Sequence, residues 1–137
     1  MKVLYYSLVV VVIDQITKLL VKGFKIPFLN IHHRGLKINS SIKIIDDLIQ
    51  ITHVENYGIA FGIDLGRDFK LAITIFTIIA ALLILYYLYI SRYKDFKVRL
   101  AIALIFGGAI GNIIDRVFFG ILYGYAPLFH GRVVDFI

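Results

Sequence analysis

The sequence predicts a mainly α-helical protein that crosses a membrane three times and carries a small β-element outside the bilayer. Hydrophobic residues fill 60% of its 137 positions, which is more than a soluble domain with a polar exterior contains. Three apolar runs are each close to the ~20 residues with which an α-helix crosses ~30 Å of hydrocarbon. Another stretch, Ser41–Glu55, is rich in Ile, Thr and Val with patches of alternation, which is typical of one or two β-strands. Residues 1–137 are therefore expected to form a single membrane domain.

The three predicted spans cover approximately residues 3–22, 69–90 and 100–119. The first run is interrupted by Asp14 and Lys18 and is not followed by a small-x-small cleavage site, so we interpret it as a retained helix. The connection 91–99 carries four basic residues and one acidic residue, which places it in the cytoplasm by the positive-inside rule. The N-terminus is then also cytoplasmic. Residues 23–68, with the β-element, and 120–137 are expected on the outer side.

The amino-acid composition and short motifs restrict the binding partners and the types of catalysis that this protein can use. The formal net charge of +6 fits anionic lipid headgroups better than nucleic acid, because the basic residues are scattered and no nucleic-acid motif occurs. The chain has no cysteine, which excludes disulfides, thiolate nucleophiles and cysteine metal sites. The histidines lack the H-E-x-x-H spacing and the serines lack a G-x-S-x-G elbow, so neither zinc nor serine catalysis is favoured.

The third apolar run contains charged residues that need an explanation. Asp115 and Arg116 are expected to form an ion pair there, although a charge at the centre of a span costs at least ~2.5–3.5 kcal/mol. The pair indicates either a functional site or a structural contact between helices. Gly107 and Gly111 form a small-xxx-small pattern that lets a second helix approach closely. On a helix, Gly108, Asn112 and Arg116 are expected to share one face, with Gly111 and Asp115 beside it. The polar side chains of the first and third spans are expected to converge at the same depth near the outer surface: Asp14, Lys18, Asn112, Asp115 and Arg116.

The remaining residues favour acid–base catalysis by a pair of carboxylates. Asp135 lies among apolar residues on the outer side, as Asp115 does, whereas Asp14 is expected to pair with Lys18 one helical turn away. Two aspartates can divide acid–base work, one deprotonating a water molecule while the other protonates the scissile carbonyl oxygen.

Four motifs in order resemble those of the bacterial lipoprotein signal peptidases, or signal peptidase II, from Ile13 to the last residue. They are Asp14-Gln15-x-x-Lys18, Asn56-x-Gly58-x-Ala60-Phe61-Gly62, Gly111-Asn112-x-x-Asp115-Arg116 and Val133-Val134-Asp135-Phe136. The resemblance implies an inner-membrane aspartyl endopeptidase that cuts prolipoproteins before a diacylglyceryl-modified cysteine, at the outer face of the membrane. It also implies that no metal or cofactor is needed. We expect a monomer that contacts membrane lipids and its prolipoprotein substrates.

The resemblance maps the family's first catalytic aspartate onto Asp135. It maps residues that support the site onto Asp14, Lys18, Asn56, Gly58, Asn112, Asp115 and Arg116. The family's second catalytic aspartate lies in an F-N-x-A-D motif at the start of a fourth span, and the present sequence ends at Ile137 without it. Either this chain is a truncated or partial form that lacks activity, or Asp115 substitutes. We favour the first, because Arg116 stands beside Asp115 and the family gives Asp115 a supporting role.

Some alternatives stay open at this point. Residues 117–132 form a longer, aromatic and glycine-rich loop than in many family members, and this loop is either a substrate-side flap or an insertion. The chain could be a non-catalytic membrane scaffold that binds lipidated peptides or a partner helix. A small transporter with a relay of Asp14, Lys18 and Asp115 is less favoured, because the sequence has no internal repeat.

Overall fold

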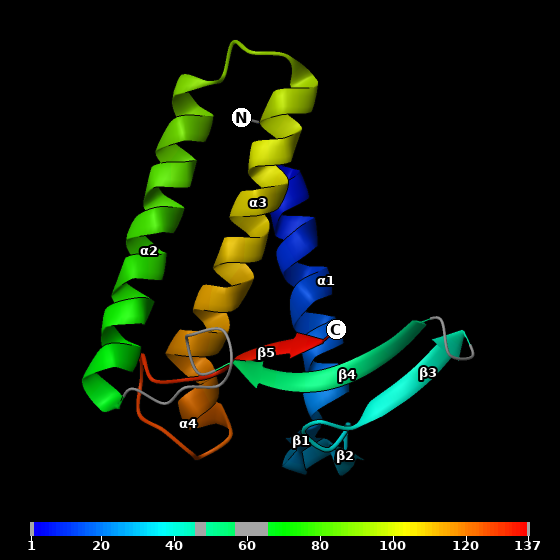
Figure 1. Cartoon of the computed structure of the whole chain (residues 1–137). Coiled ribbons are helices and arrows are strands. Elements are labelled where there is room, and N and C mark those ends of the chain that lie inside the picture. The colour runs from blue at the N-terminus through cyan, green and yellow to red at the C-terminus, as the bar shows by residue number, and fades with distance from the viewer. Residues whose placement is uncertain (1, 46–48, 57–65, 137) are drawn as a thin grey trace.

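Three long helices dominate the fold in a computed structural model, which describes residues 2–45, 49–56 and 66–136. Helix α1 covers Leu4–Lys22, α2 covers Arg67–Ile90 and α3 covers Phe96–Ile114. The π-helical turn η2 (Asp115–Phe119) and the short α4 (Gly120–Leu122) extend α3 (Figure 1). Each of the three helices is long and apolar enough to span a membrane. The predicted fold class is thereby confirmed.

The helices extend beyond the predicted spans at several ends. Helix α2 begins at Arg67, α3 begins at Phe96, and the helical path after α3 continues to Leu122. An apolar run marks the part of a helix that sits in hydrocarbon, whereas the helix itself continues into polar residues. Lys97 is exposed in the first turn of α3, where a long aliphatic stem can lie along the helix while the charge stays in water.

Helix α3 packs against both α1 and α2. A Cβ atom at Gly107 would lie 2.8 Å from the carbonyl oxygen of Ser7, and one at Gly111 would collide with the carboxylate of Asp14. The small-xxx-small interpretation of these two glycines is therefore confirmed, with α1 as the second helix. The hydroxyl of Ser7 also donates a buried hydrogen bond to the carbonyl of Ala103, at 2.7 Å. Gly108, in contrast, meets no atom within 4 Å of its ideal Cβ and does not belong to this contact.

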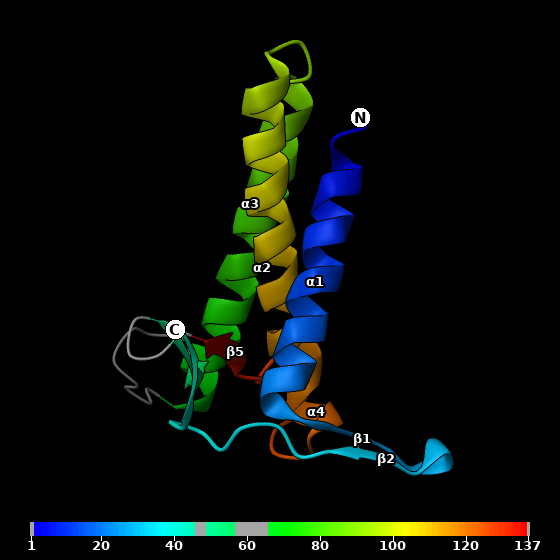
Figure 2. The same cartoon turned by 90° about the vertical axis from the view of Figure 1, so that its right-hand side faces the viewer.

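Two antiparallel sheets lie at one end of the bundle, away from the N-terminus and the α2–α3 connection (Figures 1 and 2). The first pairs β1 (Phe24–Ile26) with β2 (Ile31–His33) around the 3₁₀ turn η1 (Pro27–Leu29). The second has the order β3-β4-β5 and contains β3 (Ser41–Ile45), β4 (Ile49–Asn56) and β5 (Val133–Phe136). Strands β3 and β4 confirm the expectation for Ser41–Glu55. The β1–β2 hairpin and β5 were not predicted.

Two small clusters of buried apolar residues hold the helices together. One joins Val3, Leu88, Ile102 and Ala103 at the N-terminal end of the bundle. The other joins Val21, Phe119 and Val134 where the helices meet the sheet. Most large apolar side chains on the helices are exposed in the isolated chain, as a surface that faces lipid requires. The second cluster matters for the site, because it seats β5 on the helix ends.

Candidate active site

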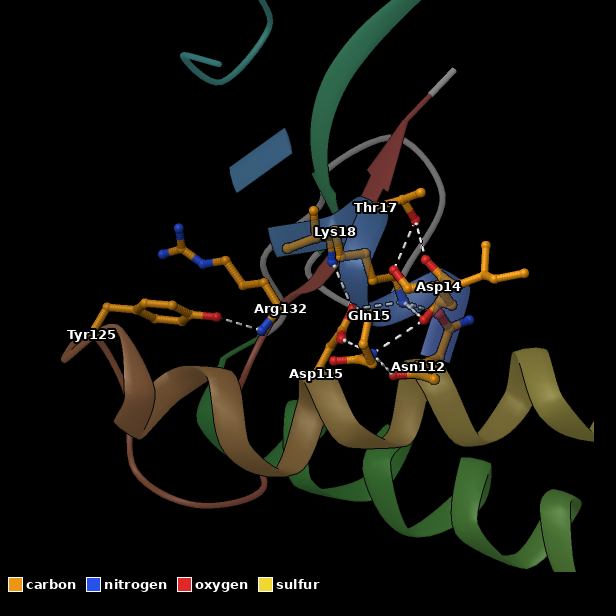
Figure 3. A network of polar contacts seen from close by, with 11 residues as sticks. Asp14, Gln15, Thr17, Lys18, Asn112, Asp115, Tyr125 and Arg132 are labelled. Carbon is orange, nitrogen blue, oxygen red and sulfur yellow. Dashed lines mark hydrogen bonds and ion pairs between the residues drawn. The ribbon is translucent and has the colours of Figure 1, made fainter. Parts of the chain in front are cut away.

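A buried charge network joins α1 to α3 near the sheet end of the bundle (Figure 3). The ammonium of Lys18 lies 2.9 Å from Oδ2 of Asp14 and 2.8 Å from Oδ2 of Asp115, and it donates to Oδ1 of Asn112 at 3.0 Å. The side chain of Lys18 is 3% exposed and that of Asp115 is 0% exposed. The predicted Asp14–Lys18 pair is confirmed, and the structure adds Asp115 to it. Lys18 thus occupies the centre of what we call the inner network, which consists of Asp14, Gln15, Lys18, Asn112 and Asp115.

Gln15 completes this network, although the sequence assigned it no role. Its amide nitrogen is within hydrogen-bond distance of Oδ2 of Asp14 (3.1 Å), the Gly111 carbonyl (3.1 Å) and Oδ1 of Asp115 (3.0 Å). The close approach at Gly111 makes this possible, because it brings the backbone of α3 within reach of α1. A polar amide next to a charged residue in an otherwise apolar helix was the available signal.

Asp115 also fixes the strand that carries Asp135. The backbone N–H of Val134 donates to Oδ2 of Asp115 at 3.0 Å, and both residues are fully buried. The oxygens of Asp115 are therefore shared between Lys18, Gln15 and the main chain of β5. A carboxylate with all of these partners is held in one position. Because Asp135 is the next residue along β5, its backbone position depends on this contact.

The expected ion pair between Asp115 and Arg116 does not form. Asp115 turns to Lys18, whereas Nη1 of Arg116 donates to the hydroxyl of Thr77 on α2 at 3.3 Å. Neighbouring helix residues point in different directions, and only residues three or four apart share a face. The expectation that Arg116 shares a polar stripe with Asn112 and Gly108 is likewise wrong. Arg116 links α3 to α2, while Asn112 and Asp115 link α3 to α1.

The sheet places Asp135 beside Asn56. In the antiparallel register of β4 and β5, Asp135 lies opposite Val54, and Asn56 lies opposite Val133. Paired residues and their second neighbours along the strand share one face of a sheet, so Asp135 and Asn56 are diagonal neighbours on the same face. Asp135 is exposed, whereas Val134 on the opposite face is buried. The predicted site residue Gly58 lies outside the described residues.

Residues 117–132, considered above as a flap or an insertion, follow the helix end closely. Their first six residues are helical. The N–H of Phe129 then donates to the carbonyl of Val117 at 3.2 Å, and the N–H of Gly131 donates to the carbonyl of Arg116 at 2.8 Å. The Thr74 hydroxyl on α2 donates to the carbonyl of Phe129 at 2.8 Å. The segment is thereby attached to α2 and α3, and it directs the chain into β5.

A second polar cluster, missed by the sequence reasoning, lies just outside the inner network. This outer cluster consists of Lys22, Glu55, Tyr123, Tyr125 and Arg132. The carboxylate of Glu55 accepts from the ammonium of Lys22 and from Nη1 of Arg132, the latter at 3.2 Å. The ammonium of Lys22 lies 4.6 Å from the ring centroid of Tyr123, and the guanidinium of Arg132 lies 4.7 Å from that of Tyr125. The outer cluster joins α1, β4 and the segment before β5.

The two tyrosines of the outer cluster stay protonated and act as hydrogen-bond groups. Burial, with the nearby carboxylates, raises the pKa of Tyr123 to about 12. Burial also raises the pKa of Tyr125. The Tyr123 hydroxyl donates to the carbonyl of Gly23 at 2.7 Å, and the Tyr125 oxygen accepts from the N–H of Arg132 at 2.8 Å (Figure 3). The first contact attaches the segment after α4 to the end of α1, and the second folds this segment back onto the residue that precedes β5.

Glu55 should make stability depend on pH. Burial opposes its ionisation, but the hydrogen bonds and positive charges of Lys22 and Arg132 outweigh burial and lower the pKa of Glu55. A lowered pKa stabilises the folded state above the usual glutamate pKa of about 4.3, and this contribution disappears as the pH falls through the folded pKa. We expect Glu55→Gln to lower the thermal unfolding midpoint at pH 7, with a difference from the unmodified protein that shrinks toward pH 4. Equal differences at both pH values in a thermal unfolding series would contradict this.

Among residues 2–45, 49–56 and 66–136, no group of three or more His, Asp or Glu side chains lies close enough together to hold an ion. His33 and His130 instead contact the carbonyls of Leu20 and Leu128, each through a ring nitrogen at 2.7–2.8 Å. The contact of His130 is local, whereas that of His33 joins strand β2 to helix α1.

The fold and the site together define a multi-pass membrane protein whose inner network positions an exposed aspartate at one end of its helices. The family model for signal peptidase (SPase) II matches residues 6–137. The chain belongs to the signal peptidase II family, which is a family of aspartic peptidases.

Individual relatives agree with this assignment. A lipoprotein signal peptidase of Halothermothrix orenii is 40% identical over 118 residues, which cover 86% of this chain and 72% of the relative. One of Halalkalibacterium halodurans is 36% identical over 136 residues, which cover 98% of this chain and 72% of the relative. One of Syntrophus aciditrophicus is 37% identical over 98 residues, which cover 69% of this chain and 61% of the relative.

A solved structure shares the fold. It is described as a bacterial membrane enzyme determined by the in meso method at 2.3 Å resolution. The two chains are 30% identical and superpose with a TM-score of 0.63 over 98% of this chain and 68% of that one. The similarity supports the helical architecture described above.

Proposed function

We propose that the gene product containing these 137 residues removes signal peptides from prolipoproteins by cutting before a diacylglyceryl-modified cysteine, with Asp135 as one catalytic carboxylate. Membership of the signal peptidase II family supports the reaction. We assign the catalytic role to Asp135 because of its position. Its carboxylate is exposed on a strand whose backbone is fixed by the buried Asp115. An aspartate in that position can reach a substrate while its backbone stays in place.

The structure favours Asp135 over Asp115 as the reacting group. Asp115 has no exposed surface, and its carboxylate already binds Lys18, Gln15 and the N–H of Val134. A general base must come within hydrogen-bond reach of the proton that it removes, and Asp115 could do so only by leaving these partners. We therefore assign Asp115 a positioning role together with Asp14, Lys18 and Asn112. Asn56 and Gly58 are proposed to support the substrate side, where Asn56 shares a sheet face with Asp135.

The orientation that we propose places the N-terminus and the α2–α3 connection in the cytoplasm and Asp135 at the outer face of the bacterial inner membrane. The basic connection between α2 and α3 supports this through the positive-inside rule. The sheet end then meets secreted prolipoproteins after they have crossed the membrane. We propose that the enzyme acts as a monomer and uses neither metal nor cofactor.

A cleavage assay tests the reaction. The gene product that contains these 137 residues is purified in detergent and given one prolipoprotein in two forms, either lipid-modified at the cysteine or with serine in its place. We expect cleavage of the lipid-modified form to be faster by at least about a hundredfold, because each buried methylene of an acyl chain is worth about 0.8 kcal/mol. Mass spectrometry should identify the modified cysteine as the new N-terminus. Equal cleavage of both forms would exclude a lipid-dependent peptidase, and binding without cleavage would support the scaffold alternative.

A further inference from the structure

A pocket of about 700 Å³ opens at the end of the bundle away from the sheet. It lies between the start of α1 and the connection from α2 to α3, which are neighbours in both views of the fold (Figures 1 and 2). It is therefore separated from Asp135 and the inner network by most of the length of the helices. The charge network and the β-strands contribute nothing to its lining, so the proposed peptidase reaction does not account for it.

Positive charge lines this pocket. Lys2, Arg92 and Arg99 contribute side chains, and no acidic side chain is among its described lining residues. Arg92 is held in place, since its guanidinium lies 4.5 Å from the ring centroid of Tyr89 and 4.6 Å from that of Tyr93. The Nε atom of Arg99 is buried and has no hydrogen-bond partner within the described part of the chain. Hydrogen bonds from charged guanidinium groups to anionic oxygens are stronger than those between neutral groups, so the basic lining of this pocket favours an anionic ligand.

The rest of the lining is apolar and aromatic. Leu88 and Val3 are buried and belong to the apolar cluster at this end of the bundle. Tyr6 and Phe96 make an edge-to-face contact with ring centroids 6.1 Å apart, and Tyr93 is 86% exposed at the rim. Aromatic side chains of this kind sit at the level of the headgroups in membrane proteins. The pocket therefore combines an apolar interior with a cationic edge.

We propose that this pocket binds an anionic phospholipid of the adjacent leaflet. The phosphate would pair with Lys2, Arg92 and Arg99, and the glycerol and upper acyl chain would contact the exposed rings of the lining, Tyr5, Tyr6 and Phe96. A free phosphate ion would satisfy the charges alone, whereas an amphiphile with an anionic head satisfies both parts of the lining. The pocket also lies at an end of apolar helices that are long enough to span the membrane, where lipid headgroups are found.

Lipid binding can be measured on the purified gene product by native mass spectrometry. The probes are dioleoyl phosphatidylglycerol, dioleoyl phosphatidylcholine and inorganic phosphate. The test variant is the double substitution Arg92→Gln with Arg99→Gln. The matched control is Lys94→Gln with Lys97→Gln, which removes the same charge from neighbouring positions outside the pocket lining. Thermal unfolding of both variants checks that they remain folded.

We expect phosphatidylglycerol to bind the unmodified protein and the lysine control with similar affinity. It should bind the arginine variant at least about tenfold more weakly, since a basic side chain near the membrane surface contributes appreciably to binding anionic lipid. Phosphatidylcholine should bind weakly to all three proteins, and millimolar inorganic phosphate should not displace phosphatidylglycerol. The proposal would be overturned by equal losses in both variants, which indicate non-specific attraction. Unchanged binding in the arginine variant, equal binding of phosphatidylcholine, or displacement by phosphate alone would also overturn it.

Discussion

Replacing Asp135 by Asn is expected to reduce the rate of prolipoprotein cleavage by about 10²–10⁴-fold, because proton transfer by a positioned side chain contributes about that much to an enzymatic rate. An amide has nearly the same shape as a carboxylate but can neither accept the proton of the attacking water nor share a proton with a second acid. Since Asp135 is exposed, the substitution should change the thermal unfolding midpoint very little. The measurement is the single-turnover rate on a lipid-modified prolipoprotein.

The control for this prediction is Asp95→Asn. It makes the same chemical change at an exposed position that directly precedes α3, at the opposite end of the bundle from β5. Cleavage by this variant should match that of the unmodified protein. If Asp135→Asn retained most of the activity while a folded Asp115→Asn variant lost it, the catalytic carboxylate would be Asp115 instead.

Replacing Lys18 by Met should destabilise the protein by about 3–5 kcal/mol, which is the usual cost of removing one partner from a buried ion pair. Methionine fills a similar volume, so the loss would come from charge. Asp14 and Asp115 would face each other without the ammonium that now lies within 3 Å of both. Unfolding in detergent with increasing denaturant would measure the effect. We also expect slower cleavage, because Asp115 would no longer hold the Val134 N–H in its present place.

Two further variants separate this charge effect from a general loss of a lysine. Lys25→Met changes an exposed lysine on β1 and should be nearly neutral. Combining Lys18→Met with Asp115→Asn should restore part of the stability, because it removes one of the two carboxylates left without a cation. If Lys18→Met unfolded at the same denaturant concentration as Lys25→Met, the inner network would not stabilise the fold.

The inner network and the outer cluster converge on the same strand. Asp115 holds the N–H of Val134, and Arg132 binds Glu55 of the neighbouring strand β4. Both contacts connect β5 to elements near the ends of α1 and α3. A short strand of four residues has little stability by itself. We infer that much of the polar structure of this protein serves to place residues 133–135.

The sequence by itself determined the features that depend on neighbours along the chain. Apolar runs predicted the three spans, since a helix must satisfy its own backbone in hydrocarbon. The spacing of Asp14 and Lys18 predicted their pair, and the spacing of Gly107 and Gly111 predicted a close helix contact. Alternation in Ser41–Glu55 predicted strands β3 and β4. Each of these signals lies within one continuous stretch of sequence, so it can be recognised without knowing how the chain folds.

Only the tertiary structure decided which distant residues meet. The sequence placed Asp115 beside Arg116, but the packing of α3 against both α1 and α2 turned Asp115 to Lys18 and Arg116 to Thr77. The contact of Glu55 with Arg132 spans 77 positions and depends on the register of β4 and β5. Strand β5 itself was not recognised, because four residues carry too little periodicity. The two side-chain contacts share one physical reason: the partner of a side chain is set by the relative placement of whole elements, and local spacing along the chain does not contain that placement.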